Sequence, residues 1–199
     1  ALKILQELTL IFSTKEDAKI YEQMAAKCKK SFEEKFYQAR RKCLYDVLGD
    51  SKIRPNQLFA LSLTYPVMDP ASDRAKEMLE TVTKKLLTPY GLKTLAKGEK
   101  DYIEVYEGDS FKRDMSYHQG ITWPWLLGLY FNSMRAILKA EKDKNKKKEQ
   151  EEKYKSFCEK TEKVMRKAFY EEGSVGGISE LYDSKAPYLP KGAAFQAWG

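Results

Sequence analysis

Helical segments of two kinds alternate along the chain, and this alternation limits the folds open to it. Residues 58–63 and 125–138 are apolar on most faces, which is typical of helices surrounded by protein. The segments that follow them, 75–86 and 149–170, carry one apolar stripe beside charged neighbours, which is typical of helices at a surface. A double layer of inner and outer helices, closed as a toroid or extended as a solenoid, has this pattern. Because no internal repeat is evident, the solenoid is disfavoured.

Two further helices are predicted at the start of the chain. Apolar residues recur at helical spacing from Ala1 to Phe12 and again from Tyr21 to Phe32. Ser13, followed three residues later by Glu16, has the pattern of a capping box that would start the second helix. Helices joined by so short a turn pair as an antiparallel hairpin. The helical spacing is then lost, and residues 43–48 predict a short strand or one arm of a β-hairpin.

Prolines mark the starts of three later helices. Pro55, Pro70 and Pro124 each stand where a first helical turn tolerates the missing N–H, and Asp69 is the predicted N-cap before Pro70. Between these helices, residues 87–119 interrupt the pattern for too long to be a simple connector. Loops of this length are usually functional or disordered, and the four tyrosines of this one favour order.

Composition favours one folded domain. The chain has 199 residues, of which 42% are hydrophobic and 13% aromatic, which is enough for a substantial core. The net charge of +7 raises the question of a nucleic-acid partner. Residues 139–155 contain eight lysines and five acids, however, and this sign-mixed run supplies nearly half of the excess. It is typical of a solvated helix end or connector, which we expect to be mobile, and we expect no nucleic-acid partner.

The cysteines, the apolar runs and the absence of known motifs narrow the class of protein to which the chain can belong. Cys28, Cys43 and Cys158 are widely spaced without a CxxC pair, which predicts buried free thiols in a reducing cytoplasm. No apolar run is long enough to span a membrane and no export signal opens the chain, although an upstream signal is left open. His118 is the single histidine, so a multi-histidine metal site is excluded. No nucleotide-binding, zinc-protease or serine-hydrolase motif is present, so we expect no cofactor and consider carboxylate chemistry.

One candidate for that chemistry is the loop at 173–198. Three glycines free the backbone just before Glu180 and Asp183, and Pro187 and Pro190 stiffen the residues that follow. Such a loop can hold a carboxylate at a fixed depth in a cleft. The alternative is that both acids are solvated loop residues.

A second polar and aromatic cluster occupies residues 113–125. The flat ring of Tyr117 or Trp123 can stack on a sugar, and polar neighbours can bind its hydroxyls. His118 is equally well explained by a structural hydrogen bond, and Trp125 by a place in the core. The candidate hydroxyl-binding residues, which include the stretch that starts at Arg54, are Asp114, His118, Gln119, Arg54, Asn56 and Gln57.

These motifs carry a resemblance to a known family. Ile178–Asp183 followed by Gly192–Trp198, the cluster Arg113–Trp125 and the stretch Arg54–Gln57 stand in the same order as motifs of glycogen debranching enzymes. The part that the chain resembles is their C-terminal amylo-α-1,6-glucosidase domain. The Ser-Glu-x-Tyr-Asp core is also similar to the base-bearing loop of glucoamylases.

The resemblance implies a fold and a mechanism. The fold would be all-α, an (α/α)6 toroid in which long loops and short strands carry the site. Residues 1–199 would form a single domain that is about half of this toroid, truncated at both ends. The activity would be inverting hydrolysis of α-1,6-glucosidic branch points in glycogen or limit dextrin, with Glu180 as general base. Asp183 would be the alternative base or a group that holds the loop. The general acid would lie upstream, so these residues alone are not expected to debranch glycogen.

Two alternatives stay open. The same toroid can serve another sugar, as in an α-1,4-glucosidase or a trehalase-like enzyme, or the chain can be a non-catalytic helical binding module. The expected partner is a branched α-glucan or oligosaccharide in the first case, and the oligomeric state is not predicted.

Overall fold

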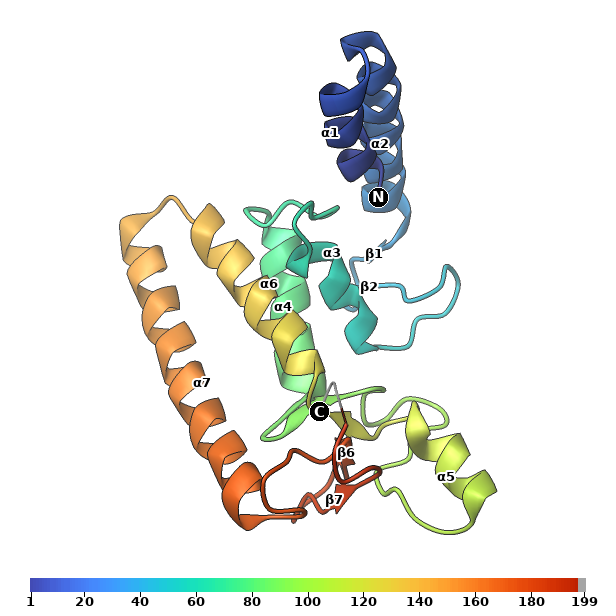
Figure 1. Cartoon of the computed structure of the whole chain (residues 1–199), viewed down its shortest axis with the longest axis vertical. Coiled ribbons are helices and arrows are strands. Elements are labelled where there is room, and N and C mark those ends of the chain that lie inside the picture. Colours follow the sequence, from blue (N-terminus) through green and yellow to red (C-terminus); the bar gives the residue numbers. More distant parts are fainter. Residues whose placement is uncertain (197–199) are drawn as a thin grey trace.

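The computed structural model describes residues 1–196 and shows a mostly α-helical protein (Figure 1). Ala197 and Trp198 of the predicted C-terminal motif lie outside the described residues. The helices are α1 (Leu2–Phe12), α2 (Lys15–Lys35), the 3-10 helix η1 (Pro55–Leu58), α3 (Phe59–Ser62), α4 (Asp73–Leu86), α5 (Ser110–Tyr117), α6 (Leu126–Ala140) and α7 (Lys144–Glu171). The strands are β1 (Tyr37–Gln38), β2 (Cys43–Leu44), β3 (Leu87–Thr88), β4 (Gly91–Lys93), β5 (Thr122–Trp123), β6 (Leu181–Tyr182) and β7 (Pro190–Lys191).

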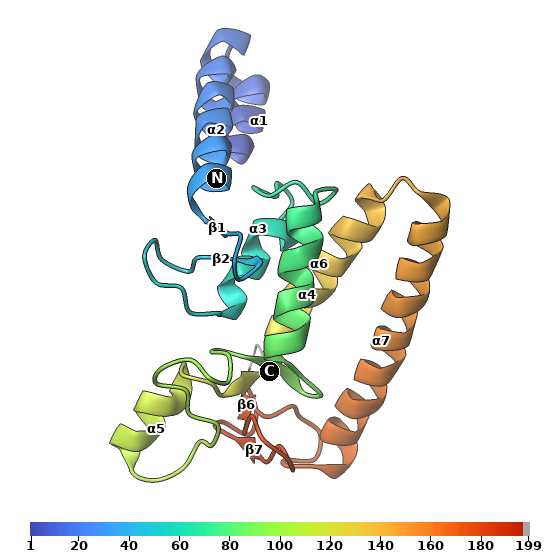
Figure 2. The same ribbon diagram turned by 180° about the vertical axis from the view of Figure 1, so that it is seen from behind.

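Helices α1 and α2 form the predicted antiparallel hairpin, which extends from one end of the molecule (Figures 1 and 2). The predicted cap is one residue out of place. Ser13 ends α1, where its N–H donates to the Thr9 carbonyl, and Thr14 is the N-cap of α2, with its hydroxyl accepting from the Asp17 N–H at 3.1 Å. The expected burial of Cys28 is also wrong, because this part of the hairpin has little protein packed around it.

The core lies where α3, α4 and α6 meet the β1–β2 hairpin. The predicted stripe of α4 is confirmed, since Ala75, Met78, Val82 and Leu86 are all buried. The predicted start at Asp69 is wrong. Asp69 accepts from the Ala71 N–H in a turn, and the helix is capped by the Ser72 hydroxyl, which accepts from Ala75.

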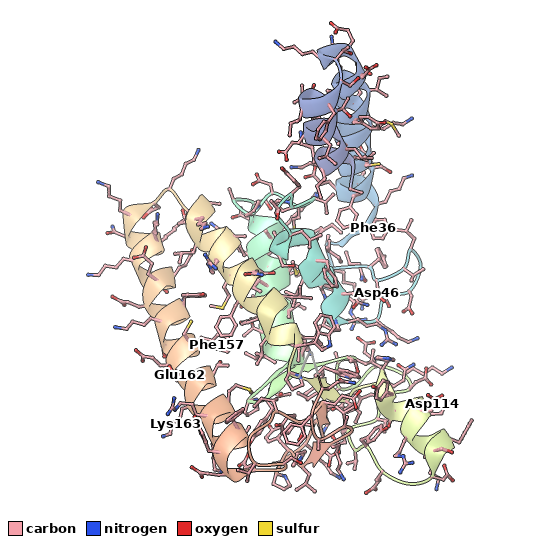
Figure 3. All side chains as sticks on the ribbon, viewed as in Figure 1. Phe36, Asp46, Asp114, Phe157, Glu162 and Lys163 are labelled. Carbon is pink, nitrogen blue, oxygen red and sulfur yellow. The ribbon has the colours of Figure 1, made fainter. Side chains whose placement is uncertain are left out.

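Most of the lysine-rich run at 139–155 is helical and exposed, which agrees with a solvated helix end and not with a long connector. Only residues 141–143 separate α6 from α7, and the Asp143 carboxylate caps α7 by accepting from two backbone N–H groups. Lys153 and Glu149 then pair one turn apart. On the inward side, Phe157 packs against α6 (Figure 3), as the predicted stripe requires.

A five-stranded antiparallel sheet joins the two long loops, with strand order β3-β4-β5-β6-β7. The interruption at 87–119 is therefore ordered, and it contributes β3, β4 and α5. Trp123 of β5 pairs with Leu92, and Thr122 pairs with Tyr182 of β6. Because β6 directly follows Glu180, this pairing brings the C-terminal loop against the cluster at 113–125.

None of the helices in the described residues 1–196 has both the length and the apolar character needed to cross a membrane.

Candidate functional site

Glu180 is held in place by three hydrogen-bond donors. It precedes β6 and is 7% exposed. Its Oε1 accepts from the hydroxyl of Tyr117 and, at 2.9 Å, from Nε2 of Gln196. Its Oε2 accepts from the Ala193 N–H at 2.9 Å. The side chain therefore points into protein, toward the 113–125 cluster, instead of into bulk solvent.

These contacts set the protonation state of Glu180. Burial raises the pKa of the carboxyl group, whereas the hydrogen bonds from Tyr117, Ala193 and Gln196 lower it. The hydrogen bonds outweigh burial, so the pKa lies below its ordinary value. The same contact stabilises the protonated phenol of Tyr117, whose pKa is raised by burial and by the Glu180 charge. Glu180 is therefore an ionised carboxylate near pH 7, able to accept a proton.

Aromatic rings adjoin this carboxylate. Tyr117 meets Trp123 edge to face with ring centroids 4.8 Å apart, and the Trp123 indole N–H donates to the Tyr117 carbonyl at 3.1 Å. His118 stacks on Trp123 at 5.5 Å. Trp123 is only 4% exposed. The predicted pair of rings is thus brought together beside Glu180, with Trp123 as the buried support and His118 on the exposed side.

A hollow of about 270 Å³ opens beside these rings. Arg54, Asn56, His118 and Trp123 line it together with Trp125. The interpretation of Trp125 as a core residue is wrong, because its side chain is 37% exposed and faces this hollow. Trp125 is the N-cap residue of α6 and therefore stands at the end of the helix, not within it. In the sequence, Pro124 was the signal that Trp125 lies near the start of the helix.

Two predicted binding residues hold the walls of this hollow. The Arg54 guanidinium donates to the carbonyls of Thr94 and His118 at 3.1 and 2.8 Å and to Oε1 of Gln119 at 2.8 Å. Gln57 is buried; it accepts from the Leu44 N–H and donates to the Arg54 carbonyl. The hydrogen-bonding capacity of Arg54, Gln57 and Gln119 is thus directed largely at protein.

Asn56, Asp183 and Asp114 have different surroundings. Asn56 is exposed and donates to Oδ1 of Asp46 at 2.9 Å. Asp183 is buried, accepts from the Tyr106 N–H at 2.8 Å and lies 3.7 Å from the Lys191 ammonium group, contacts that suit a group holding the loop. Asp114 is exposed on α5, which stands apart from the α4–α6 pair (Figure 3).

The His118 imidazole has a lowered pKa. Partial burial of the ring and the Arg54 charge lower it, and the Asp114 carboxylate opposes them in part. His118 is therefore neutral near pH 7 and can both donate and accept a hydrogen bond at the hollow.

Sequence reasoning missed two contacts to Glu180. Gln196 and the Ala193 N–H both lie in the predicted motif at 192–198, yet neither was singled out. The motif turns back on the Glu180 segment because the Glu180 N–H donates to the Ala193 carbonyl at 2.9 Å. Glu180 and Ala193 thus hydrogen-bond to each other in both directions, and no local sequence pattern predicts that the chain turns back to allow this.

The chain matches a known protein family. A family model described as amylo-alpha-1,6-glucosidase matches residues 1–199. The chain belongs to this family. It is therefore a glycoside hydrolase of the amylo-alpha-1,6-glucosidase type, and the family implies an α-glucan substrate.

Other features of the described residues do not suggest a competing active site. Within residues 1–196, acids, histidine and cysteines form no cluster of three that could hold a metal ion. A larger hollow, of about 600 Å³, lies between α4, α6 and α7. It is lined mainly by apolar and lysine side chains, together with Glu80, Thr83 and Gln150, and it contains none of the predicted site residues. The Glu180 region remains the candidate site.

Proposed function

We propose that Glu180 is the general base in the inverting hydrolysis of α-1,6-glucosidic branch points of glycogen or limit dextrin. The observation that carries the proposal is the buried, ionised carboxylate with three donors beside the aromatic cluster. A carboxylate has about four lone-pair sites, and two donors use Oε1 while one uses Oε2. The remaining site on Oε2 can accept a proton from water.

In the proposed reaction this water attacks the anomeric carbon as its proton passes to Glu180. The bond from that carbon to the leaving oxygen breaks, and a general acid protonates the oxygen. In inverting enzymes the two carboxyl groups lie roughly 6.5–9.5 Å apart, which leaves room for the water. We propose that the acid comes from a part of the protein outside these 199 residues, and that the 199 residues alone do not debranch glycogen.

We also propose that the chain forms about half of an (α/α)6 toroid. The packing of α3 and α6 against each other, with α4 and α7 outside them, supports two layers of helices. In this arrangement the loops before η1, before α6 and after α7 lie on one face with Glu180. A cytoplasmic location, in agreement with three free cysteines, is part of the same proposal.

A comparison of substrates tests the proposed reaction. In the enzyme that contains both carboxyl groups, we expect glucose release from limit dextrin at a kcat/KM at least about 10-fold above that for linear maltooligosaccharides or trehalose, because only the dextrin presents the α-1,6 bond. Release of β-glucose, followed by NMR, would report inversion. Faster turnover of maltooligosaccharide or trehalose would favour the other toroid glucosidases, and binding without turnover would favour a binding module.

Tyr117→Phe tests the role of the hydrogen bonds to Glu180. The change removes the phenol donor, so the Glu180 pKa rises. A general base works only when deprotonated, and its activity is lost as the pH falls through its pKa. We therefore expect the acidic limb of the kcat/KM profile to move to higher pH.

Tyr106→Phe is the matched control for that measurement. The Tyr106 ring lies 6.0 Å from that of Tyr117, and the hydrogen bond that Tyr106 donates to Asp183 comes from its backbone N–H, which the change to Phe retains. Its profile should coincide with that of the unmodified enzyme. An acidic limb unmoved by Tyr117→Phe would show that Glu180 does not set it.

A further inference from the structure

A second hollow of about 270 Å³ lies next to the one beside Trp125. It is formed where the C-terminal end of α2, the loop after β2, and the start of α3 come together. Phe36 and Asp46 mark two of these walls in Figure 3. Its aromatic lining comes from Phe32, Phe36, Tyr45 and Phe59.

The two hollows share a wall. Asn56 lines both of them, so they meet at this exposed side chain. Each is slightly smaller than the roughly 300–1,000 Å³ of ordinary ligand sites, whereas the two together fall within that range. The shared residue places the two hollows side by side, so a sugar chain of sufficient length can contact both.

The walls of the second hollow are fixed in the free protein. The Gln57 side chain holds the Leu44 N–H at 3.1 Å, and Asn56 holds Asp46 at 2.9 Å, so the loop after β2 is fastened to η1. Phe32 and Phe36 stack with centroids 4.7 Å apart. A ligand that enters this hollow would not have to order these walls.

The chemistry of the lining suits a sugar chain. Aromatic faces pack on the apolar face of a pyranose ring, and the Asn56–Asp46 pair offers amide and carboxylate groups to its hydroxyls. Phe59 is 39% exposed, so its ring is open to such a ligand. We infer that the hollow between α2 and α3 binds the glucan chain beyond the glucosyl residue held near Trp125 and His118. This inference rests on the proposed function, because the chain that it places in the hollow is that of the proposed substrate.

The test is a titration of the 199-residue chain with glucose, maltose and maltopentaose, followed by two-dimensional NMR. Maltopentaose should shift the backbone amide signals of Tyr45, Asp46 and Phe59, and glucose should shift only signals around His118 and Trp125. Maltopentaose should also bind more tightly than maltose, because it reaches both hollows. This measurement needs no variant.

Phe59→Ala removes one aromatic face of the second hollow. We expect it to weaken maltopentaose binding about three- to tenfold and to leave maltose binding unchanged. Phe111→Ala is the matched control, because Phe111 is 72% exposed on α5 and lines neither hollow. Circular dichroism of both variants checks that they fold.

The outcomes separate this inference from the proposed function. The inferred glucan binding at the second hollow would be contradicted if binding did not tighten with chain length. It would also be contradicted if maltopentaose shifted only signals near His118. Neither result would bear on the role of Glu180. Turnover that survives the loss of Glu180 would overturn the base, whereas length-dependent binding at Phe59 would still support the second hollow.

Discussion

Replacing Glu180 by Gln lowers kcat for limit dextrin by about 10²–10⁴-fold or more in the enzyme that contains both carboxyl groups, because an amide cannot take the proton of the attacking water. The amide is nearly isosteric with the carboxylate, so the aromatic walls and both hollows keep their shape. We therefore expect binding of maltooligosaccharide to stay close to that of the unmodified enzyme. Steady-state kinetics and calorimetric titration measure the two effects separately.

The structure also predicts a cost in stability for Glu180→Gln. The carboxylate accepts from donors on both oxygens, whereas an amide has one accepting oxygen. If the oxygen faces Tyr117 and Gln196, the amide NH₂ faces the Ala193 N–H, and two donors then oppose each other. Leaving such a buried group unsatisfied costs about 1–3 kcal/mol, so the variant should unfold at a lower temperature but remain folded at 25 °C.

Glu172→Gln is the matched control for this experiment. Glu172 also accepts from a tyrosine hydroxyl, that of Tyr90 at 2.7 Å, but it is the C-cap residue of α7 and its partners are Tyr90 and Lys167 instead of Tyr117. Its replacement should leave kcat unchanged. Asp183→Asn addresses the alternative base, and we expect it to affect mainly stability, since Asp183 holds Tyr106 and lies near Lys191. A larger loss of kcat from Asp183→Asn than from Glu180→Gln would assign the base to Asp183.

The helices were largely predictable because their signals are local. Pro55 is the first residue of η1, Pro124 lies just before the N-cap of α6, and the apolar stripe of α4 is buried as its spacing requires. The lysine-rich run was predicted only in part. Its composition resembles that of a solvated segment, but a cap at Asp143 and pairing one turn apart stabilise a helix that buries only its apolar side.

The candidate site was predictable in part. The part that could not be predicted depends on pairing between residues far apart in the sequence. The glycine-rich loop indicated a carboxylate held at a fixed position, and Glu180 is buried and held. Its contact with Tyr117 spans 63 residues and depends on the pairing of β5 with β6, which no local pattern specifies. Polar type alone also cannot separate a ligand-binding group from a structural one. Arg54 and Gln57 bind neighbouring loops, although their sequence pattern suits hydroxyl recognition equally well.

Gly192 is the position where the smallest change should have a large effect on the site. Its φ is +71°, a backbone conformation that favours glycine. A Cβ added there would lie 2.5 Å from Oε2 of Glu180 and 3.0 Å from Cγ of Leu181. Oε2 is the oxygen to which we assign the water. In Gly192→Ala the methyl group therefore displaces either the carboxylate or the attacking water.

We expect Gly192→Ala to lower kcat/KM by about 10²-fold, since a displacement of about 1 Å at a reacting group has an effect of this size. Gly176→Ala is the matched control. Gly176 has a φ of +91° in the same loop, so its replacement carries a similar backbone strain of about 1–2 kcal/mol, but a Cβ there meets no atom within 4 Å. Kinetics and thermal unfolding of both variants separate the effect of backbone strain from that of the contact between the added methyl group and Glu180. Equal losses of activity in the two variants would mean that backbone strain alone is responsible, and would contradict the assignment of the water to Oε2.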